Sequence, residues 1–360
     1  MAPPVEWIVT GAAGFIGCNA VASFLERGDD VVGIDDLSRP GAERNLDWLQ
    51  GLGGNFTFAR RDVRDAAALG EVFAEHDGAS AVLHLAGQVA VTTSIRDPRA
   101  DFQTNAVGTF NVCEATRLHV PGAVLINAST NKVYGARADE GVGLVDGRWW
   151  SASHPQGIDE TAPLDFHSPY ACSKGAGDQY VLDYARTYGL RTVTLRQSCI
   201  YGPRQFGIED QGWVAWLTAA ALAGRPFTIY GDGRQVRDLL FVDDLVALYS
   251  ACSAEPETVA GRALNVGGGP SNALSLLQLV SFLEARLGRP VEYEQAPPRS
   301  GDQRFFVADT RAVAELLGWR PGVDVASGLE RLTGWIEANL EHVLAAVDRR
   351  QAETAHPSRG

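Results

Sequence analysis

The stretch Thr10-Gly11-Ala12-Ala13-Gly14-Phe15-Ile16-Gly17 decides how this chain is expected to fold. It stands between an apolar run at residues 5–10 and a run of helical periodicity at residues 15–27, so a strand, a glycine-rich turn and a helix follow one another. Gly11 permits the tight turn, Gly14 lets a phosphate approach the backbone, and Gly17 lets the helix pack closely on the strand. The free N–H groups at the start of the helix then predict a site for a dinucleotide pyrophosphate.

Strands and helices alternate outward from this turn to about residue 200. Further strands are expected at residues 30–35, 55–60, 79–85, 123–128 and 191–195, and further helices at residues 101–119 and 168–188. Such alternation is typical of parallel βαβ units with right-handed crossovers. The sequence therefore predicts an α/β protein with a Rossmann-type, doubly wound parallel sheet.

The pattern becomes less regular after residue 200, which indicates a smaller C-terminal lobe of mixed α/β structure. We expect residues 1–200 to form the dinucleotide-binding domain, with a returning segment at about 236–267. The expected substrate-binding lobe comprises residues 201–235 and 268–345, and residues 346–360 are expected to form a flexible tail. Residues 136–160 carry few periodic signals and are expected to form a long loop.

Acidic residues at the end of the second expected strand indicate which dinucleotide binds. Asp35 stands where a carboxylate accepts hydrogen bonds from the adenosine ribose hydroxyls and repels a 2′-phosphate. Asp36 adds a second negative charge, although Arg39 is close enough in sequence to offset part of it. We therefore predict NAD rather than NADP as the cofactor.

A tyrosine and a lysine at helical spacing form the second motif. Tyr170 and Lys174 lie at i and i+4 and so share one helix face, and Ser168 and Pro169 are typical of a helix start. A free tyrosine has a pKa of about 10, which a neighbouring lysine charge together with the positive nicotinamide ring is expected to lower. Tyr170 is then a candidate base for a hydroxyl proton, and Thr130 at a strand end is expected to hydrogen-bond the reacting oxygen.

Composition excludes several other classes of function. The formal net charge of −13 comes without a basic stripe, which argues against nucleic-acid binding. The chain has no apolar run near the length of about 20 residues that spans a membrane, and its first residues do not resemble a secretory leader, so a cytoplasmic location is expected. The five cysteines are scattered, so we expect neither a metal site nor a disulfide framework.

Several motifs together resemble the NAD-dependent epimerase/dehydratase family of the extended short-chain dehydrogenase/reductase superfamily. They are TGAAGFIG (10–17), HLAG (84–87), NASTNKVYG (127–135), YACSK (170–174) and VRDLLFVDDL (236–245). A second set resembles the CDP-paratose 2-epimerases, also called CDP-tyvelose 2-epimerases, which invert C2 of a CDP-linked dideoxy sugar with bound NAD. It comprises LAGQVAVTTS (85–94), STNKVYG (129–135), LDFHSPYACSKGAGDQYVLDYAR (164–186), DQGWV (210–214) and DQRFFVAD (302–309).

The resemblance implies a role for each matched position. It implies catalysis by Thr130, Tyr170 and Lys174. It implies NAD contacts from Gly11, Gly14, Phe15, Ile16, Gly17, Asp35, Asp36, Asp62, Val63, Leu85, Ala86 and Gly87, as well as from Tyr170 and Lys174. It implies substrate contacts from Thr93, Ser94, Asn131, Lys132, Arg204, Arg237, Arg299 and Arg304. Arg237 and Arg299, assisted by Arg304, are expected on the diphosphate, and His167 is a further sugar-pocket candidate. It also implies a homodimer or a homotetramer.

Two residues after the catalytic threonine bear on the type of reaction. The 4,6-dehydratases of this family carry an Asp-Glu pair there for the removal of water, whereas this chain has Asn131 and Lys132. Neither is a carboxylate, so elimination lacks its acid and base and epimerisation is favoured. The alternatives are another nucleotide-sugar epimerase or reductase, acting on a UDP-, GDP- or dTDP-linked sugar, and an NAD-binding redox sensor without catalysis.

Overall fold

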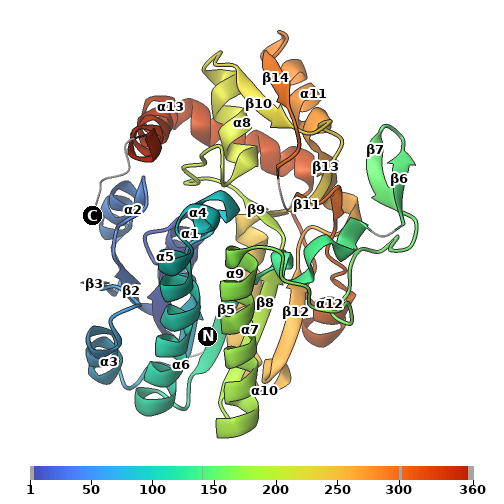
Figure 1. Cartoon of the computed structure of the whole chain (residues 1–360). Coiled ribbons are helices and arrows are strands. Elements are labelled where there is room, and N and C mark those ends of the chain that lie inside the picture. The colour runs from blue at the N-terminus through green and yellow to red at the C-terminus, as the bar shows by residue number, and fades with distance from the viewer. Residues whose placement is uncertain (1–3, 140, 300–301, 356–360) are drawn as a thin grey trace.

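The computed structural model describes residues 4–139, 141–299 and 302–355. A seven-stranded sheet with the order β12-β8-β5-β4-β1-β2-β3 forms its centre, and every neighbouring pair is parallel (Figure 1). The strands are β1 (Glu6–Thr10), β2 (Asp30–Asp35), β3 (Phe56–Arg60), β4 (Ala81–His84), β5 (Val124–Thr130), β8 (Arg191–Gln197) and β12 (Arg262–Val266). The predicted Rossmann-type sheet is confirmed, because each connection carries helices back to start a further parallel strand.

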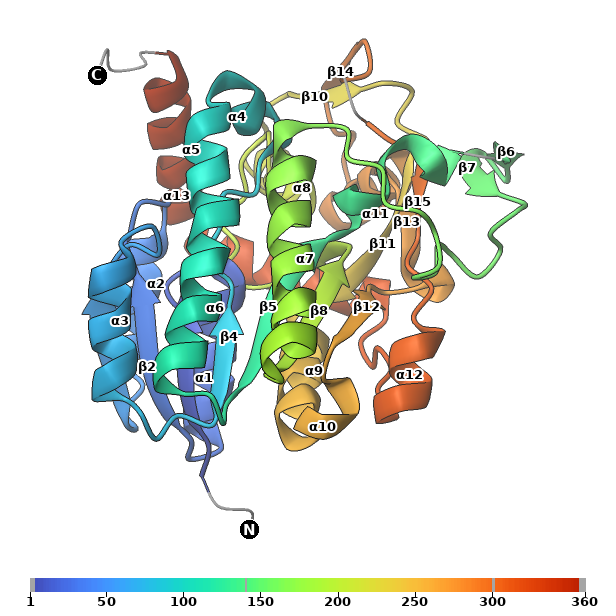
Figure 2. The same cartoon turned by 60° about the horizontal axis from the view of Figure 1, so that its bottom comes forward.

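Helices cover both faces of this sheet (Figure 2). One face carries α3 (Ala66–Glu75), α5 (Pro98–Phe102), α6 (Gly108–His119) and α7 (Pro169–Tyr188), and the other carries α1 (Phe15–Glu26), α2 (Ala42–Gln50), α9 (Val242–Ala254) and α10 (Pro256–Val259). A π-helical turn at Gln103–Val107 joins α5 to α6 within the region expected as one helix. The central strands are buried on both faces, which explains their continuous apolar runs.

The smaller lobe lies beyond the carboxyl ends of the strands. One small sheet joins β9 (Cys199–Tyr201), β11 (Val236–Phe241), β13 (Ala273–Ser275) and β15 (Phe305–Phe306), and another pairs β10 (Phe227–Tyr230) with β14 (Tyr293–Ala296). Its helices are α8 (Trp213–Leu222), α11 (Leu276–Leu287) and α13 (Val325–Ala355), whereas α12 (Arg311–Leu317) packs against β12 at the edge of the large sheet. Of the segment expected to return, only β12 pairs with the large sheet, whereas β11 belongs to a small one.

Two regions expected to be irregular contain regular structure. Within residues 136–160, β6 (Val142–Val145) and β7 (Arg148–Ser151) form an antiparallel hairpin that projects at the right of Figure 1. The helix α13 continues into the expected tail as far as Ala355, and Val347 on it is buried; residues 356–360 lie outside the described part of the chain. No helix among the described residues is long and apolar enough to cross a bilayer.

Candidate active site

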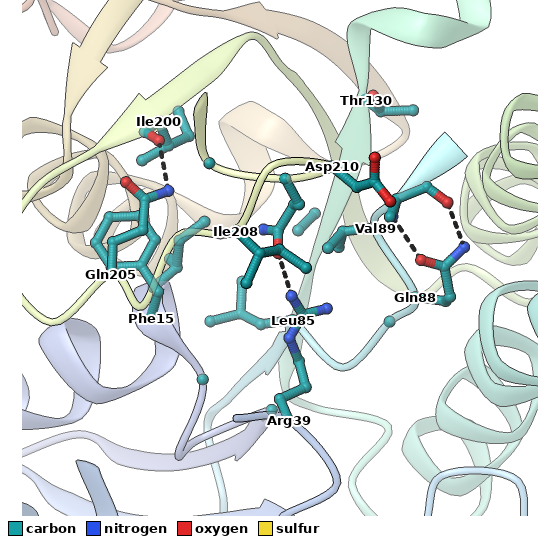
Figure 3. Close-up of a pocket in the computed structure, with 18 of the residues that line it drawn as sticks. Phe15, Arg39, Leu85, Gln88, Val89, Thr130, Ile200, Gln205, Ile208 and Asp210 are labelled. Atoms are coloured by element: carbon teal, nitrogen blue, oxygen red, sulfur yellow. Dashed lines mark hydrogen bonds between the residues drawn. The ribbon is translucent and has the colours of Figure 1, made fainter. Parts of the chain in front are cut away.

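A cavity of about 1020 Å³ lies between the carboxyl ends of the parallel strands and the smaller lobe. Figure 3 looks into it, with Phe15, Leu85 and Thr130 from the large sheet's side and Gln205, Ile208 and Asp210 from the segment that precedes α8. Ligands of doubly wound sheets bind at this edge, so the position of the cavity agrees with the predicted dinucleotide site.

The glycine-rich turn forms one end of the cavity. A Cβ on Gly17 would lie 2.0 Å from the carbonyl oxygen of Gly11, and one on Gly11 would lie 2.7 Å from the backbone nitrogen of Ala86. The turn is therefore packed as tightly as glycine allows. Gly14 caps α1 without any side-chain hydrogen bond, and Gly14, Phe15 and Ile16 line the cavity. Uncapped N–H groups beside an open cavity fit the pyrophosphate of a dinucleotide.

Asp35 is held in place at the adenosine end that the sequence predicts. Its carboxylate accepts hydrogen bonds from the backbone N–H groups of Ala13, at 3.0 Å, and Leu37, at 2.8 Å. Burial raises the pKa of Asp35, and these two hydrogen bonds counteract that rise. Asp36 also lines the cavity and accepts hydrogen bonds from Ser38, so both predicted carboxylates lie at this end.

The remaining residues predicted to contact the cofactor line the same cavity. They are Asp62, Val63, Leu85, Ala86 and Gly87, which follow the carboxyl ends of strands β3 and β4. The guanidinium of Arg64 hydrogen-bonds both carboxylate oxygens of Asp62 and lowers its pKa. A Cβ on Gly87 would lie 3.9 Å from the Nζ atom of Lys174, so this wall reaches the predicted catalytic lysine.

Thr130, Tyr170 and Lys174 meet at the centre of the cavity, and each is at least nine-tenths buried. Helix α7 begins as predicted, with the Oγ atom of Ser168 accepting a hydrogen bond from the backbone N–H of Ala171 and Pro169 in the first turn. Thr130 ends β5, and its hydroxyl group donates to the side-chain oxygen of Asn131 at 3.4 Å. The three side chains thus come from two elements that pack directly on each other.

The charge of Lys174 alone does not lower the pKa of Tyr170. Burial raises that pKa and the neighbouring Thr130 only partly offsets the rise, whereas the sequence predicts a pKa lowered by Lys174 and the nicotinamide ring together. The reason is geometric, because the ammonium of Lys174 donates to the backbone carbonyl of Ala128 and is itself buried. Burial also lowers the pKa of Lys174 to about 8.

Two buried carboxylates behind the trio were missed by the sequence analysis. Asp101 accepts hydrogen bonds from Ser173 on α7, at 2.6 Å, and from Gln88, at 2.8 Å. Asp178 forms a buried ion pair with Arg196 at 3.0 Å and accepts a hydrogen bond from Ser129 at 2.7 Å. Both fix α7 against the strand ends. Their sequence neighbourhoods show no pattern that separates them from surface carboxylates.

The predicted substrate residues fall into two groups. The first group lines the cavity and comprises Asn131 and Lys132, directly after β5, together with Arg204, Arg237 and Arg299. The guanidinium of Arg237 donates to the backbone carbonyls of Val236 and Gln303, at 2.8 and 2.7 Å, and is buried. Arg299 lies over the ring of Tyr230 at 3.8 Å. Two guanidinium groups at one end of a cavity suit a diphosphate.

The structure does not bring Thr93, Ser94 or Arg304 to the cavity. Helix α4 (Val91–Arg96) turns Thr92 and Ile95 toward it instead, and the Oγ atom of Ser94 is buried and donates to the carbonyl of Val91 at 2.7 Å. The guanidinium of Arg304 lies over the ring of Trp149 at 4.8 Å, outside the cavity.

His167 lies outside the cavity as well. Its Nε2 atom is 2.9 Å from a carboxylate oxygen of Asp165, and half of its side chain is exposed. The sequence alone does not distinguish Thr93, Ser94, Arg304 and His167 from the residues that line the cavity, because the difference depends on how the chain folds.

Another group of cavity residues was given no role from the sequence, although two of them, Asp210 and Gln211, belong to the motif DQGWV (210–214). They come from the segment before α8 and from the small sheets of the lobe, and they comprise Cys199, Gln205, Ile208, Glu209, Asp210, Gln211, Tyr230 and Gln235. The segment has neither helical nor alternating periodicity, so the sequence did not place it against the cavity. Among the described residues, no group of three or more potential ligands could hold a metal ion.

Comparison with known proteins gives one family over most of the chain. The model of the NAD dependent epimerase/dehydratase family matches residues 7–267. A CDP-paratose 2-epimerase of Salmonella typhi is 42% identical over 336 residues, which cover 92% of this chain and 99% of that enzyme. A UDP-glucose 4-epimerase of Mycolicibacterium smegmatis is 36% identical over 324 residues, covering 90% and 96% of the two chains.

Solved structures of similar fold also come from this family. A Thermus thermophilus UDP-glucose 4-epimerase, solved in complex with NAD, superposes with a TM-score of 0.77 at 31% identity, covering 92% of this chain and 99% of that one. The similarity extends over the large sheet and the smaller lobe, and therefore over both sides of the cavity.

Proposed function

The chain belongs to the NAD dependent epimerase/dehydratase family, and from this membership we propose that it inverts C2 of CDP-paratose to give CDP-tyvelose. The observation that carries the proposal is the 42% identity to a CDP-paratose 2-epimerase over nearly the full length of both chains. The reaction class and the cofactor rest on broader evidence than the substrate does. The relatives are epimerases of nucleotide sugars, so the protein is an epimerase, and its family is NAD dependent, so NAD is its cofactor.

The glycine turn and Asp35 are the residues that would hold NAD. The first-turn N–H groups of α1 would bind the pyrophosphate, and the carboxylate of Asp35, fixed by Ala13 and Leu37, would accept hydrogen bonds from the ribose hydroxyls. Bound there, NAD would supply a reversible hydride acceptor for the sugar carbon. Inversion needs no net oxidant, so the cofactor can stay bound through turnover.

Tyr170 moves the hydroxyl proton in this proposal. Its phenol takes the proton from the C2 hydroxyl as the carbon becomes a ketone, and gives it back when the opposite face is reduced. Thr130 lines the same cavity, where its hydroxyl group would hydrogen-bond the reacting oxygen. Lys174, one turn further along α7, also lines the cavity, and its charge together with that of the nicotinamide ring would favour the phenolate.

The arginines let the sugar turn while the nucleotide stays fixed. Arg237 and Arg299 would bind the diphosphate oxygens, and Arg204 lines the same cavity. Neither Asn131 nor Lys132 next to Thr130 is a carboxylate, which removes the acid and base that elimination of water needs. This difference favours inversion over dehydration within the family.

A panel of nucleotide sugars tests the proposal. Purified protein is incubated without added NAD with CDP-paratose and with UDP-, GDP- and dTDP-linked sugars, and NMR follows every ring carbon. We expect conversion of CDP-paratose at C2 alone. Turnover of a UDP- or GDP-sugar without conversion of CDP-paratose would show the substrate assignment to be wrong.

Tyr170→Phe is the matched control for that panel. The variant keeps the ring and loses only the hydroxyl group, so it should bind NAD normally and lose activity by about 10²- to 10⁴-fold, the usual contribution of a general acid–base group. The NAD content of the purified variant, measured after denaturation, separates loss of chemistry from loss of cofactor.

A further inference from the structure

A strap crosses the cavity between the two sides of the molecule, and we define it as residues 205–212. Its base is fixed, because Phe206 packs edge-on against Trp335 at 5.7 Å and a Cβ on Gly207 would lie 2.6 Å from the carbonyl oxygen of Gly212. Its tip is a tight turn in which the backbones of Ile208 and Gln211 exchange hydrogen bonds of 2.9 and 3.0 Å. Glu209 and Asp210 stand at the tip.

The tip holds an arginine of the smaller lobe. The guanidinium of Arg299 lies 3.1 Å from a carboxylate oxygen of Glu209 and 3.5 Å from one of Asp210. Tyr230 completes the arrangement, because its ring lies beneath Arg299 and its hydroxyl group donates to Glu209 at 2.7 Å. Two carboxylates therefore neutralise one of the arginines that the proposed function assigns to the diphosphate.

The same turn also reaches the cofactor side. The guanidinium of Arg39, which follows the predicted ribose-binding carboxylates, donates to the side-chain carbonyl of Gln211. Asp210 lies 4.0 Å from Arg96 at the end of α4. Figure 3 draws Arg39, Ile208, Asp210 and Thr130 around one cavity, so the tip of the strap and Thr130 of the catalytic trio face the same space.

We propose that Glu209 and Asp210 act as built-in counter-ions that hold Arg299 until the diphosphate of a substrate displaces them. This inference rests on the proposed function, which places the diphosphate on Arg299. A diphosphate brings at least two negative charges to a guanidinium that already has two carboxylates within 3.5 Å. The like charges repel, so the tip withdraws from Arg299 as the substrate binds. The strap thus makes the affinity for the diphosphate lower than the arginines alone would give.

Calorimetric binding of nucleotides to the NAD-loaded protein tests this competition. Glu209→Gln removes the charge and keeps the shape and the hydrogen-bond acceptor, so CDP should bind about fivefold more tightly, while cytidine, which has no phosphate, should bind unchanged. The split between CDP and cytidine distinguishes competition at Arg299 from a general change in the protein. Glu292→Gln, which removes an exposed charge of the same lobe outside the cavity, should alter neither affinity.

Arg299→Gln separates the two proposals. Unchanged or weaker CDP binding in Glu209→Gln, with weaker binding in Arg299→Gln, would overturn the counter-ion role and leave the diphosphate site intact. If Arg299→Gln leaves the binding of CDP, UDP, GDP and dTDP unchanged, Arg299 does not hold the diphosphate. That result would overturn both the counter-ion role of the strap and the diphosphate contact that the proposed function assigns to Arg299. Tighter binding of UDP rather than CDP in Glu209→Gln would support the strap while contradicting the assigned nucleobase.

Discussion

The pKa of Lys174 depends on the surroundings of its side chain more than on its being a lysine. The ammonium is enclosed by protein and donates to the carbonyl of Ala128. Burial lowers its pKa to about 8, although the charges of Asp178 and Asp101 favour the protonated form. The lysine therefore loses its proton near the upper end of the physiological range, and with it the charge that favours ionisation of Tyr170.

This lowered pKa predicts a pH-dependent stability with a defined sign. The unfolded chain keeps the lysine protonated up to a pH of about 10.4, so between about pH 8 and that value it binds a proton that the folded protein does not. The free energy of unfolding of the NAD-free protein should therefore rise with pH over this window, by roughly 3 kcal/mol relative to Lys174→Met. Urea denaturation at pH 7, 9 and 10 measures the difference, and a constant difference would contradict the lowered pKa.

At the scale of elements, the contact between α1 and the turn after β1 determines both packing and cofactor binding. Gly17 is the point of closest approach, because a Cβ there would meet the Gly11 carbonyl oxygen at 2.0 Å and the Cα atom of Ala12 at 2.9 Å. The atoms are backbone, so neither can move aside without moving the strand end. A shift of the helix would displace the same N–H groups that face the pyrophosphate.

Gly17→Ala should therefore lower the free energy of unfolding by about 2 kcal/mol, because overpacking outweighs the helix propensity gained. It should also weaken NAD binding by at least about tenfold, since the helix start moves. Gly334→Ala is the matched control, because Gly334 is exposed on α13 and a Cβ there would meet nothing within 4 Å. Chemical denaturation and fluorescence titration with NAD measure both variants. Equal stabilities would show that the contact is not as tight as the structure indicates.

For the whole molecule, the sequence predicts the features that depend on residues close together in the chain, and it does not predict those that depend on contacts between distant residues. The turn at Gly11, the cap at Ser168 and the spacing of Tyr170 and Lys174 all lie within a few residues of the structure that they determine. The contact of Arg299 with Glu209 joins residues 90 positions apart, and no local pattern predicts it. The raised pKa of Tyr170 depends in the same way on burial by distant segments.

Of two further differences, the β6–β7 hairpin had a signal in the sequence, whereas the orientation of α4 did not. Asp146 and Gly147, both with positive φ, form the turn of the β6–β7 hairpin, and Asp-Gly between short apolar runs is a strong hairpin signal. The positions of Thr93 and Ser94 depended on the rotational phase of α4, which is only six residues long. A helix that short has too few residues for its buried face to be inferred from periodicity.

The two sides of the cavity share one hydrophobic core, which makes the molecule a single folding unit. Trp7 of β1 and Leu332 of α13 are fully buried members of the same cluster. Leu332→Ala should therefore cost about 2–5 kcal/mol and shift the unfolding of sheet and lobe together. Tryptophan fluorescence and far-ultraviolet circular dichroism should give coincident denaturation curves, and Leu118→Ala, at a position 58% exposed, should leave them in place. Two separate transitions would mean that α13 and its lobe unfold while the dinucleotide-binding sheet persists.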